Sequence, residues 1–208
     1  MNQAKSLDIL SAIEQVIPNP KCELDYSNMF ELICAVMLSA QTTDKRVNII
    51  TKELFAKYPN ALLLKNASYT DVYNIIESVG LAHNKTKNLI SLARAINEDY
   101  GDVVPNTMDE LLKLPGVGRK TASVVLAEGF KIPAMPVDTH LHRMAIRLGY
   151  IKPNQSILDA EIAYKKYIPR DMWIKAHHLL LLFGRYYCKA SNPNCNICNL
   201  KNICKHKK

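Results

Sequence analysis

The chain has 208 residues, of which 48% are hydrophobic and 22% charged. This length fits one compact unit or two small lobes, and the composition excludes both a disordered chain and a large multidomain assembly. The longest uninterrupted apolar run, Leu32 to Leu38, is far shorter than the roughly 20 residues needed to cross a bilayer. We therefore expect a globular protein without a transmembrane helix.

The formal net charge is +8. This excess favours a polyanionic partner, because cationic side chains that neutralise phosphates release counterions. Nucleic acid is the leading candidate and an anionic membrane surface the weaker one, although surplus lysine can also serve solubility alone. The N-terminal segment contains Asp8 and Glu14 and lacks the apolar stretch of about 7–15 residues found in secretory signals, so we expect the protein to remain inside the cell.

Helical periodicity begins near the N-terminus. Ile9, Ile13, Val16 and Ile17 recur at spacings of three and four residues before Pro18, which predicts an amphipathic helix. Sustained period-two alternation between hairpin turns is missing from the sequence, so a sheet has little support. The pattern predicts about ten helices and an all-α fold.

Helix ends are marked by caps. Asn28 with Glu31 and Thr107 with Glu110 form capping boxes that predict two helix starts. Four glycines follow periodic segments, where a left-handed residue ends a helix, and they are Gly80, Gly101, Gly129 and Gly149.

Four cysteines lie close together near the C-terminus, at Cys188, Cys195, Cys198 and Cys204, in a segment (188–208) with five lysines and no acidic residue. Disulfides are disfavoured in a reducing compartment. Zinc suits four thiolates, but its usual ribbon has two Cys-x-x-Cys knuckles and this segment has one. A cubic iron–sulfur cluster also fits, although the spacing differs from the bacterial ferredoxin run. The spacing favours iron–sulfur and leaves zinc open, with a structural role in either case.

A glycine-containing turn, Leu114-Pro-Gly-Val-Gly118, lies between the capped segment 107–113 and an apolar helix that runs from Arg119 to Glu128. Two glycines let backbone amides point outward where the positive end of the second helix begins. The turn predicts a phosphate-binding site that contacts the DNA backbone rather than the bases, and so binds without regard to sequence. An ordinary helix–helix turn is the alternative.

Two residues near this turn are candidates for chemistry. Lys120 lies in the first helical turn, where the helix dipole and Arg119 disfavour a protonated ammonium, and a neutral amine can attack the sugar of a gripped nucleotide. A simple phosphate contact is the alternative. Asp138, in Val137-Asp-Thr-His140, precedes a periodic helix and is predicted to be its N-cap. If it faces Lys120, it can also take a proton or stabilise a cationic sugar.

Together these motifs closely resemble the endonuclease III family of bacterial DNA glycosylases. The resemblance is carried by five stretches that occur in family order and span nearly the whole chain: Leu38-Ser-Ala-Gln-Thr-Thr-Asp44, the hairpin 114–122, the segment 137–140, His177-His178 with Gly184-Arg185-Tyr186, and the four cysteines. It implies a bilobal helix-hairpin-helix glycosylase fold. A six-helix barrel domain would span 22–132, and residues 1–21 with 133–208 would form the second lobe, with a cluster loop at 188–204.

The resemblance also implies an activity. The enzyme would be a bifunctional DNA glycosylase and AP lyase that removes oxidised pyrimidines from duplex DNA and cleaves the abasic site by β-elimination through a Schiff base. Lys120 would be the nucleophile, Asp138 the activating carboxylate, and the four cysteines would hold one 4Fe-4S cluster. We expect a monomer that binds damaged double-stranded DNA and no membrane, in the bacterial cytoplasm at the nucleoid.

Further residues are implied to contact DNA. Gln41 matches the residue that fills the gap left by the extruded nucleotide, Leu81 a wedge in the opposite strand, and Asp44 a supporting carboxylate near the lesion pocket. The remaining positions are Leu114, Gly116, Val117, Gly118, Arg119, Thr121, Thr139 and His140.

Some positions depart from the family pattern. Ala82 stands where relatives carry an aromatic residue, which puts the wedge loop in question, and Leu179 and Phe183 replace more polar or bulkier residues, which we interpret as changes within the core. We interpret Cys22 and Cys34 as buried thiols without a catalytic role.

Two other functions compete. An adenine-mismatch glycosylase of the same superfamily lacks the hairpin lysine and normally has a further C-terminal domain. A non-catalytic DNA-binding protein with a redox-sensing cluster has no need for Lys120 opposite Asp138.

Overall fold

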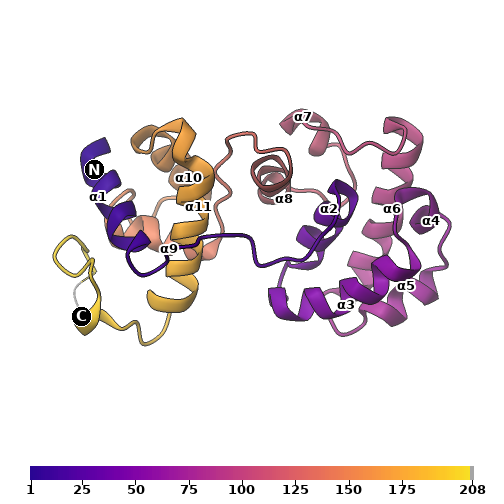
Figure 1. The fold of residues 1–208 in the computed structure, drawn as a ribbon, viewed down its shortest axis with the longest axis horizontal. Coiled ribbons are helices and arrows are strands. Elements are labelled where there is room, and N and C mark those ends of the chain that lie inside the picture. The colour runs from indigo at the N-terminus through magenta and orange to yellow at the C-terminus, as the bar shows by residue number, and fades with distance from the viewer. Residues whose placement is uncertain (207–208) are drawn as a thin grey trace. The chain divides into compact units, whose positions relative to one another are not determined.

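α-Helices form almost all of the regular structure in this computed structural model, which describes residues 1–206 (Figure 1). Within those residues the chain forms eleven α-helices, several short 3₁₀ and π turns, and no β-strand. The predicted all-α fold is therefore confirmed. Two of the C-terminal lysines, Lys207 and Lys208, lie outside the described residues. None of the helices between residues 1 and 206 is long and apolar enough to span a membrane.

The helices form two compact units, each with its own core. The hairpin unit comprises Glu23–Phe130, and the cysteine unit comprises Met1–Cys22 together with the chain from Lys131 onward. The hairpin unit contains α2 (Met29–Leu38), α3 (Asp44–Lys57), α4 (Ala61–Lys65), α5 (Tyr69–Ile76), α6 (Ala82–Tyr100), α7 (Met108–Leu111), α8 (Arg119–Val124) and the π turn η1 (Val125–Gly129).

Helix α2 is the centre of the hairpin unit. Every residue from Phe30 to Leu38 is buried, which is expected for a helix whose sequence is apolar on all sides. It packs against α3, α6, α8 and η1. The apolar run in the sequence therefore forms the core around which the other helices are arranged.

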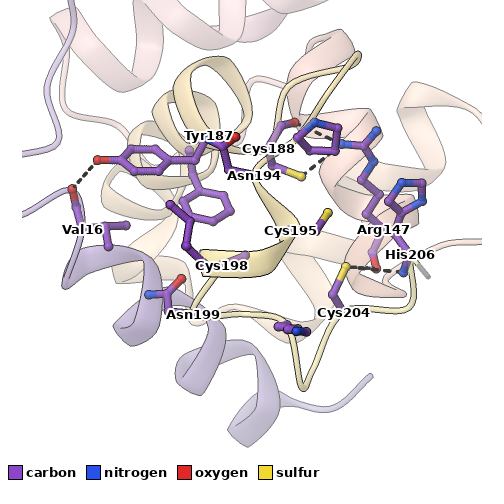
Figure 2. Close-up of a pocket in the computed structure, with 14 residues that line it drawn as sticks. Val16, Arg147, Tyr187, Cys188, Asn194, Cys195, Cys198, Asn199, Cys204 and His206 are labelled. Atoms are coloured by element: carbon purple, nitrogen blue, oxygen red, sulfur yellow. Dashed lines mark hydrogen bonds between the residues drawn. The ribbon is translucent and has the colours of Figure 1, made fainter. Parts of the chain in front are cut away.

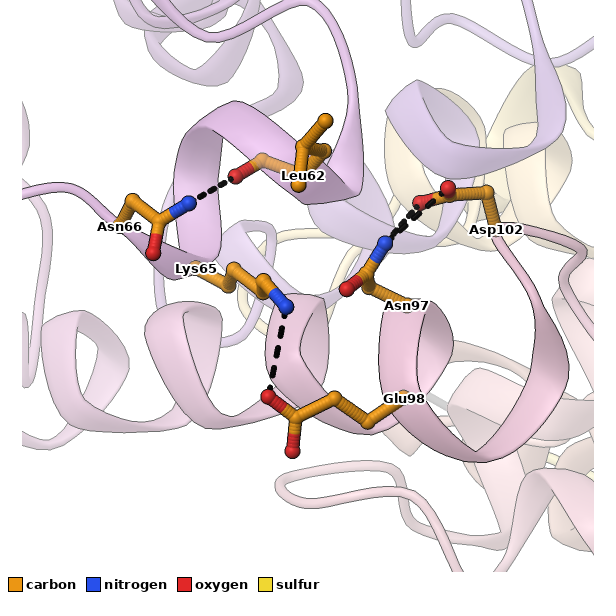
Figure 3. Close-up of polar contacts among 6 residues, drawn as sticks. All are labelled: Leu62, Lys65, Asn66, Asn97, Glu98 and Asp102. Atoms are coloured by element: carbon orange, nitrogen blue, oxygen red, sulfur yellow. Dashed lines mark hydrogen bonds and ion pairs between the residues drawn. The ribbon is translucent and has the colours of Figure 1, made fainter.

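Helix α6 runs along α4 and α5 and carries polar contacts on its surface (Figure 3). Lys65 Nζ of α4 lies 3.3 Å from Glu98 Oε1 of α6. Asn97 Nδ2 donates to both carboxylate oxygens of Asp102 at 3.0 Å, just after the helix end. Exposed pairs of this kind contribute about 1 kcal/mol or less, so the packing of α4 on α6 rests mainly on buried residues such as Leu64.

The cysteine unit joins the two ends of the chain. It contains α1 (Gln3–Glu14), α9 (Thr139–Leu148), α10 (Ile157–Tyr167), η2 (Arg170–Met172), α11 (Trp173–Leu182), η3 (Phe183–Tyr187) and η4 (Cys195–Ile197). α1 packs on α11 through Ile9 and Ile13, and α9 packs on α10 and α11. Tyr164 is fully buried in this core, and its hydroxyl donates to Leu141 O at 2.8 Å.

Both predicted N-caps are confirmed, but neither forms the reciprocal contact of a capping box: Glu31 Oε2 accepts from Ser27 N at 2.6 Å, and Glu110 Oε2 accepts from Thr107 Oγ1 at 2.7 Å. The Asn28 side chain accepts a hydrogen bond from Glu31 N at 2.9 Å at the start of α2. Thr107 Oγ1 accepts from Glu110 N at 3.3 Å at the start of α7.

The glycines divide into two kinds. Gly101 and Gly149 end their helices with φ of +57° and +79°, so their predicted left-handed conformation is confirmed. The same prediction is wrong for Gly80 and Gly129, neither of which has a positive φ. Those two are needed for space, because a side chain on Gly129 would collide with Met29 and one on Gly80 would meet the backbone of a neighbouring loop.

Candidate functional site

The turn between α7 and α8 has two buried side chains that anchor it and an exposed outer face. Leu114 and Val117 are 3% and 7% exposed, so their side chains belong to the core of the hairpin unit. Val117 N donates to Leu114 O at 3.1 Å and closes the turn. Gly116 has φ of +75°, and a Cβ atom there would lie 2.8 Å from Asn88 Cβ of α6. Leu114 and Val117 can therefore meet a ligand only through their backbone.

The outer face of the turn is where the phosphate-binding site is predicted. Gly116, Gly118, Arg119 and Lys120 are exposed, and Thr121 is half-buried. No side chain caps the start of α8 at Gly118, and the first amide groups of a helix have no partner within the helix. The turn thus combines amide donors, the positive end of a helix and two adjacent cationic side chains on one surface.

Asp138 is held rigidly at the start of α9 in the cysteine unit. Its Oδ1 accepts hydrogen bonds from His140 N at 2.9 Å and Leu141 N at 3.0 Å, so the predicted N-cap is confirmed. The buried His177 of α11 donates from Nδ1 to Pro136 O at 2.9 Å, two residues before the aspartate. The segment that carries Asp138 is therefore fixed by both α9 and α11.

The predicted catalytic residues belong to different units, Lys120 to the hairpin unit and Asp138 to the cysteine unit. Among the predicted DNA contacts of the cysteine unit, Thr139 is exposed and His140 half-buried. His140 Nδ1 lies 3.2 Å from Arg143 Nη2 on the next turn of α9.

Gln41 and Leu81 lie on two loops that touch. Gln41 follows α2 with φ of +55°, and Leu81 precedes α6 with φ of +62° and is 54% exposed. A Cβ atom on Gly80 would lie only 2.9 Å from Gln41 O, so the two backbones are in direct contact. The structure thus brings together the two residues implied to enter DNA. Asp44, the first residue of α3, is half-buried and lies three residues after Gln41 in the chain.

The buried Lys85 contacts the loop of Gln41, and sequence reasoning missed it. Its side chain is 4% exposed, and Nζ donates to Leu38 O at 2.8 Å, to Ala40 O and to Thr42 Oγ1 at 3.2 Å. Burial lowers the pKa of Lys85. A lysine within a helix ordinarily faces solvent, so periodicity alone could not have found this contact.

An aromatic stack flanks the Leu81 loop. The Tyr73 and His83 rings are 4.5 Å apart and nearly parallel, and Tyr69 stacks on Tyr73 at 6.0 Å. The Tyr69 hydroxyl and His83 Nδ1 are 2.7 Å apart. Ala82, the residue that departs from the family pattern, is 8% exposed and turned inward. The aromatic surface next to Leu81 is therefore supplied by neighbouring positions, a feature that the spacing of Tyr69 and Tyr73 could have suggested.

The four C-terminal cysteines surround one cavity of about 210 Å³ (Figure 2). No cysteine among residues 1–206 forms a disulfide. Within the same residues, no three His, Cys, Asp or Glu side chains are grouped closely enough to hold one metal ion. The four predicted ligands, Cys188, Cys195, Cys198 and Cys204, nevertheless line this one cavity.

Arg147 of α9 fixes the start of this segment. Its Nη1 donates to Cys188 Sγ at 3.2 Å (Figure 2). The same Nη1 donates to Lys189 O at 2.8 Å, and Nη2 donates to Ala190 O at 3.2 Å. The guanidinium is nearly buried, at 9% exposure of the residue. Sequence reasoning missed Arg147, because its distance along the chain from the cysteines gives no signal.

The chemistry of this donor set fits a cationic metal group. Burial raises the pKa of Cys198 and Cys204, and the neighbouring thiols raise both further. Four thiolates in one cavity repel one another, and a bound metal group removes that repulsion. Both a zinc ion and an iron–sulfur cluster take four thiolate ligands, and the four cysteines share the lining of this cavity with ten other residues.

The structure also tests the predictions for the two cysteines outside the C-terminal segment and for the two positions that depart from the family pattern in the core. Cys34 is fully buried, whereas Cys22 is half-buried, so the prediction of a buried thiol at Cys22 is wrong. Leu179 and Phe183 are 0% and 2% exposed, which agrees with their interpretation as core residues.

Comparison with known proteins decides the family. Residues 34–170 match the family described as HhH-GPD superfamily base excision DNA repair protein. Endonuclease III of Bacillus subtilis (strain 168) is 45% identical over 196 residues, which cover 94% of this chain and 90% of that protein. The chain belongs to the endonuclease III family. The resemblance in the sequence motifs is therefore confirmed.

Other members of the endonuclease III family support the same assignment. The Escherichia coli (strain K12) protein is 39% identical over 209 residues, covering 100% of this chain and 98% of the relative. A solved structure of a trapped covalent intermediate of endonuclease III with DNA superposes with a TM-score of 0.95 at 40% identity, covering 99% of this chain and 96% of that one. The predicted helix-hairpin-helix glycosylase fold is confirmed, and the chain is a base excision DNA repair protein.

Proposed function

We propose that this member of the endonuclease III family is a bifunctional DNA glycosylase and AP lyase that removes oxidised pyrimidines from duplex DNA. The observation that carries the proposal is the exposed Lys120 in the first turn of α8, directly after the amide-rich turn 116–118. A nucleophilic amine beside a phosphate-binding site would face the sugar of the bound nucleotide. The membership in a base excision repair family supports the same reaction class.

The reaction begins with extrusion of the damaged nucleotide, because a base within the duplex is out of reach. Extrusion costs a few kcal/mol, and less for a poorly stacked base. The Lys120 amine attacks C1′, the bond from C1′ to the base breaks, and the base leaves with the electron pair and a proton. The sugar ring opens to give an imine between C1′ and Lys120 Nζ.

The same imine accounts for strand cleavage. It acidifies the C2′ proton, and loss of that proton expels the 3′ phosphate by β-elimination. Water then hydrolyses the imine and releases Lys120. One lysine is thus sufficient for both activities.

We propose that Asp138 takes the proton released when the amine attacks and stabilises the cationic sugar. Its support is a carboxylate fixed by the amides of α9 and by the His177 contact. Rigid placement allows a charge to act without reorganisation in the transition state. The proposal divides the work between a domain at 22–132, which carries the nucleophile, and a second domain of 1–21 with 133–208, which carries the carboxylate.

The proposed DNA-binding residues follow from the same scheme. The hairpin backbone from Leu114 to Gly118, together with Arg119 and Thr121, would grip phosphates, and Thr139 and His140 would contact the strand near Asp138. Gln41 and Leu81 would enter the duplex, with Asp44 near the lesion pocket. The net charge of +8 favours binding to DNA. The protein would act as a monomer on chromosomal DNA in the bacterial cytoplasm.

We also propose that Cys188, Cys195, Cys198 and Cys204 hold one 4Fe-4S cluster. When bound, the cluster supplies the positive charge that four thiolates need and cross-links a segment with few core residues. Purified protein should be brown, with a broad visible absorption band and equal amounts of iron and acid-labile sulfide. A colourless protein with stoichiometric zinc would overturn the iron assignment.

Borohydride trapping tests the activity. Borohydride reduces an imine to a stable amine, so wild-type protein should form a covalent complex with duplex DNA that contains an abasic site. Lys120→Ala should abolish trapping while it retains duplex binding. The control Lys113→Ala removes an exposed lysine from the other side of the turn and should trap normally.

Undiminished trapping in Lys120→Ala would remove this lysine from the mechanism. Release of adenine from a mismatch without trapping would favour the adenine-mismatch branch of the superfamily. DNA binding without base release or strand cleavage would favour a non-enzymatic DNA-binding protein.

A further inference from the structure

Lys85 occupies an unfavourable place for a cation. It lies in the first turn of α6, where the helix dipole is positive, and the residue is 4% exposed. Burying an ammonium without partners is costly, so a lysine persists in such a place only when its surroundings compensate.

The compensation comes from the loop that carries Gln41. Lys85 Nζ donates to Leu38 O at 2.8 Å, to Ala40 O and to Thr42 Oγ1 at 3.2 Å. Leu38 is the last residue of α2, so the ammonium also lies at the negative end of that helix. All three N–H groups have an acceptor, and two of the acceptors belong to the residues on either side of Gln41.

The loop of Gln41 is in turn packed against the loop of Leu81. A Cβ atom on Gly80 would lie only 2.9 Å from Gln41 O, so the two backbones touch. The amide of Lys85 donates to Leu81 O at 3.0 Å, but this is the ordinary first hydrogen bond of α6 and does not depend on the side chain. The Lys85 side chain therefore acts directly on the loop of Gln41, and through that loop on Leu81.

The two loop residues need such support. Gln41 and Leu81 both adopt the left-handed conformation, with φ of +55° and +62°, although neither is glycine. A non-glycine residue holds this conformation only when the surrounding structure fixes it. The contacts of Lys85 provide that restraint on both sides of Gln41.

We propose that Lys85 is a positioning residue that holds Gln41 and Leu81 in one arrangement before DNA binds, so that both enter the duplex together when the nucleotide is extruded. The inference rests on the proposed function, because that function gives Gln41 and Leu81 their roles. Lys85 itself touches neither DNA nor the reacting atoms. Its contribution is preorganisation, which lowers the ordering cost of the two loops on binding.

The test compares Lys85→Met with Lys87→Met, which removes the same charge from an exposed position of the same helix. Two DNAs are used: a duplex with an oxidised pyrimidine, where the gap must be filled, and a single strand with a preformed abasic site, where there is no gap. Lys85→Met should slow single-turnover base release from the duplex by about 10- to 100-fold, the effect expected on losing a buried charged hydrogen-bonding group. Trapping on the single strand should match that of Lys87→Met.

A double-mutant cycle adds a readout that a purely structural role would not change. If Lys85 acts through Gln41, then Lys85→Met should cause no further loss of duplex activity in a Gln41→Ala background. Fluorescence of 2-aminopurine opposite the lesion should report insertion of the two loops, and the signal should fall in Lys85→Met and persist in Lys87→Met.

Each outcome decides the matter. Equal losses on both DNAs, or losses that add to those of Gln41→Ala, would assign Lys85 a general folding role, and full duplex activity would overturn the proposal outright. If Lys85→Met does not fold, Thr42→Val takes its place, because it removes one acceptor of the Lys85 ammonium. This variant must show a smaller loss of activity that is likewise confined to the duplex. A Thr42→Val variant without that loss would overturn the proposal. Failure of wild-type protein to trap would refute the lysine chemistry alone, because the 2-aminopurine signal is independent of it.

Discussion

Asp138 is observed as an N-cap and proposed as a catalytic carboxylate, and a series of substitutions can separate the two roles. As the N-cap of α9, its Oδ1 accepts two amide hydrogen bonds, at 2.9 and 3.0 Å. Replacement by alanine removes both and should lower the free energy of unfolding by about 1–2 kcal/mol. For a chain of this size, that loss corresponds to a fall in Tm of roughly 2–8 °C. Asparagine and serine are equally good N-caps, so Asp138→Asn and Asp138→Ser should unfold near the wild-type temperature.

Catalysis should respond differently, because it needs the negative charge. A positioned general acid or base contributes about 10²- to 10⁴-fold to a rate, and none of the three replacements carries a carboxylate. Base release should therefore fall by about 10²-fold or more in Asp138→Asn, Asp138→Ser and Asp138→Ala alike. Only the alanine variant should also lose stability.

The assay combines single-turnover base release, thermal unfolding by circular dichroism, and binding to a duplex that contains a non-cleavable abasic-site analogue. Ser156→Ala is a matched control, because Ser156 caps α10 in the same unit through a capping box with Asp159. It should lower Tm by a similar amount and leave base release unchanged. A wild-type rate in Asp138→Asn would leave the aspartate only its cap, and rates that follow Tm through the series would show that stability explains the loss.

Three further predictions concern the turn, the cysteine loop and a buried thiol. Gly116→Ala should lower the free energy of unfolding by about 1–3 kcal/mol and weaken duplex binding, because φ there is +75° and the space for a side chain is filled. Gly118→Ala should be tolerated, because the space around Gly118 is open. Equal effects of the two substitutions would contradict this prediction. Arg147→Met should speed the loss of visible absorbance on exposure to a chelator, since the guanidinium holds the first cysteine segment, and an unchanged decay would refute that role. Burial raises the pKa of Cys34, so at about pH 8 iodoacetamide should label Cys22 and spare Cys34 in the folded protein, as read by mass spectrometry, and equal labelling would contradict it.

Features encoded by neighbouring residues could be predicted from the sequence. The cap at Asp138 depends on a carboxylate and the two amides that follow it, and both lie within one helical turn. The turn 114–118 is likewise determined by its own glycines and by the helices on either side. The apolar run of α2 required burial on all sides, and the structure places it at the centre of a unit.

Features that depend on distant contacts could not be predicted. Lys85 and the carbonyl of Leu38 are 47 positions apart, and nothing in the spacing of a lysine within a helix marks it as buried. Arg147 and Cys188 are 41 positions apart. The errors at Gly80 and Gly129 have the same origin, because a close approach between two segments leaves no periodic pattern and resembles a helix end.

Gripping DNA and recognising damage call for different parts of this protein. The turn proposed to bind phosphates through its amides, together with a net charge of +8, would supply affinity that falls with salt and carries no information about the base. Discrimination must therefore arise where the duplex is opened, since a poorly stacked base costs less to extrude. The two left-handed loop residues and the buried Lys85 beneath them are in place before DNA arrives. Because their ordering cost is met during folding, the energy of extrusion is left to distinguish a damaged base from a normal one.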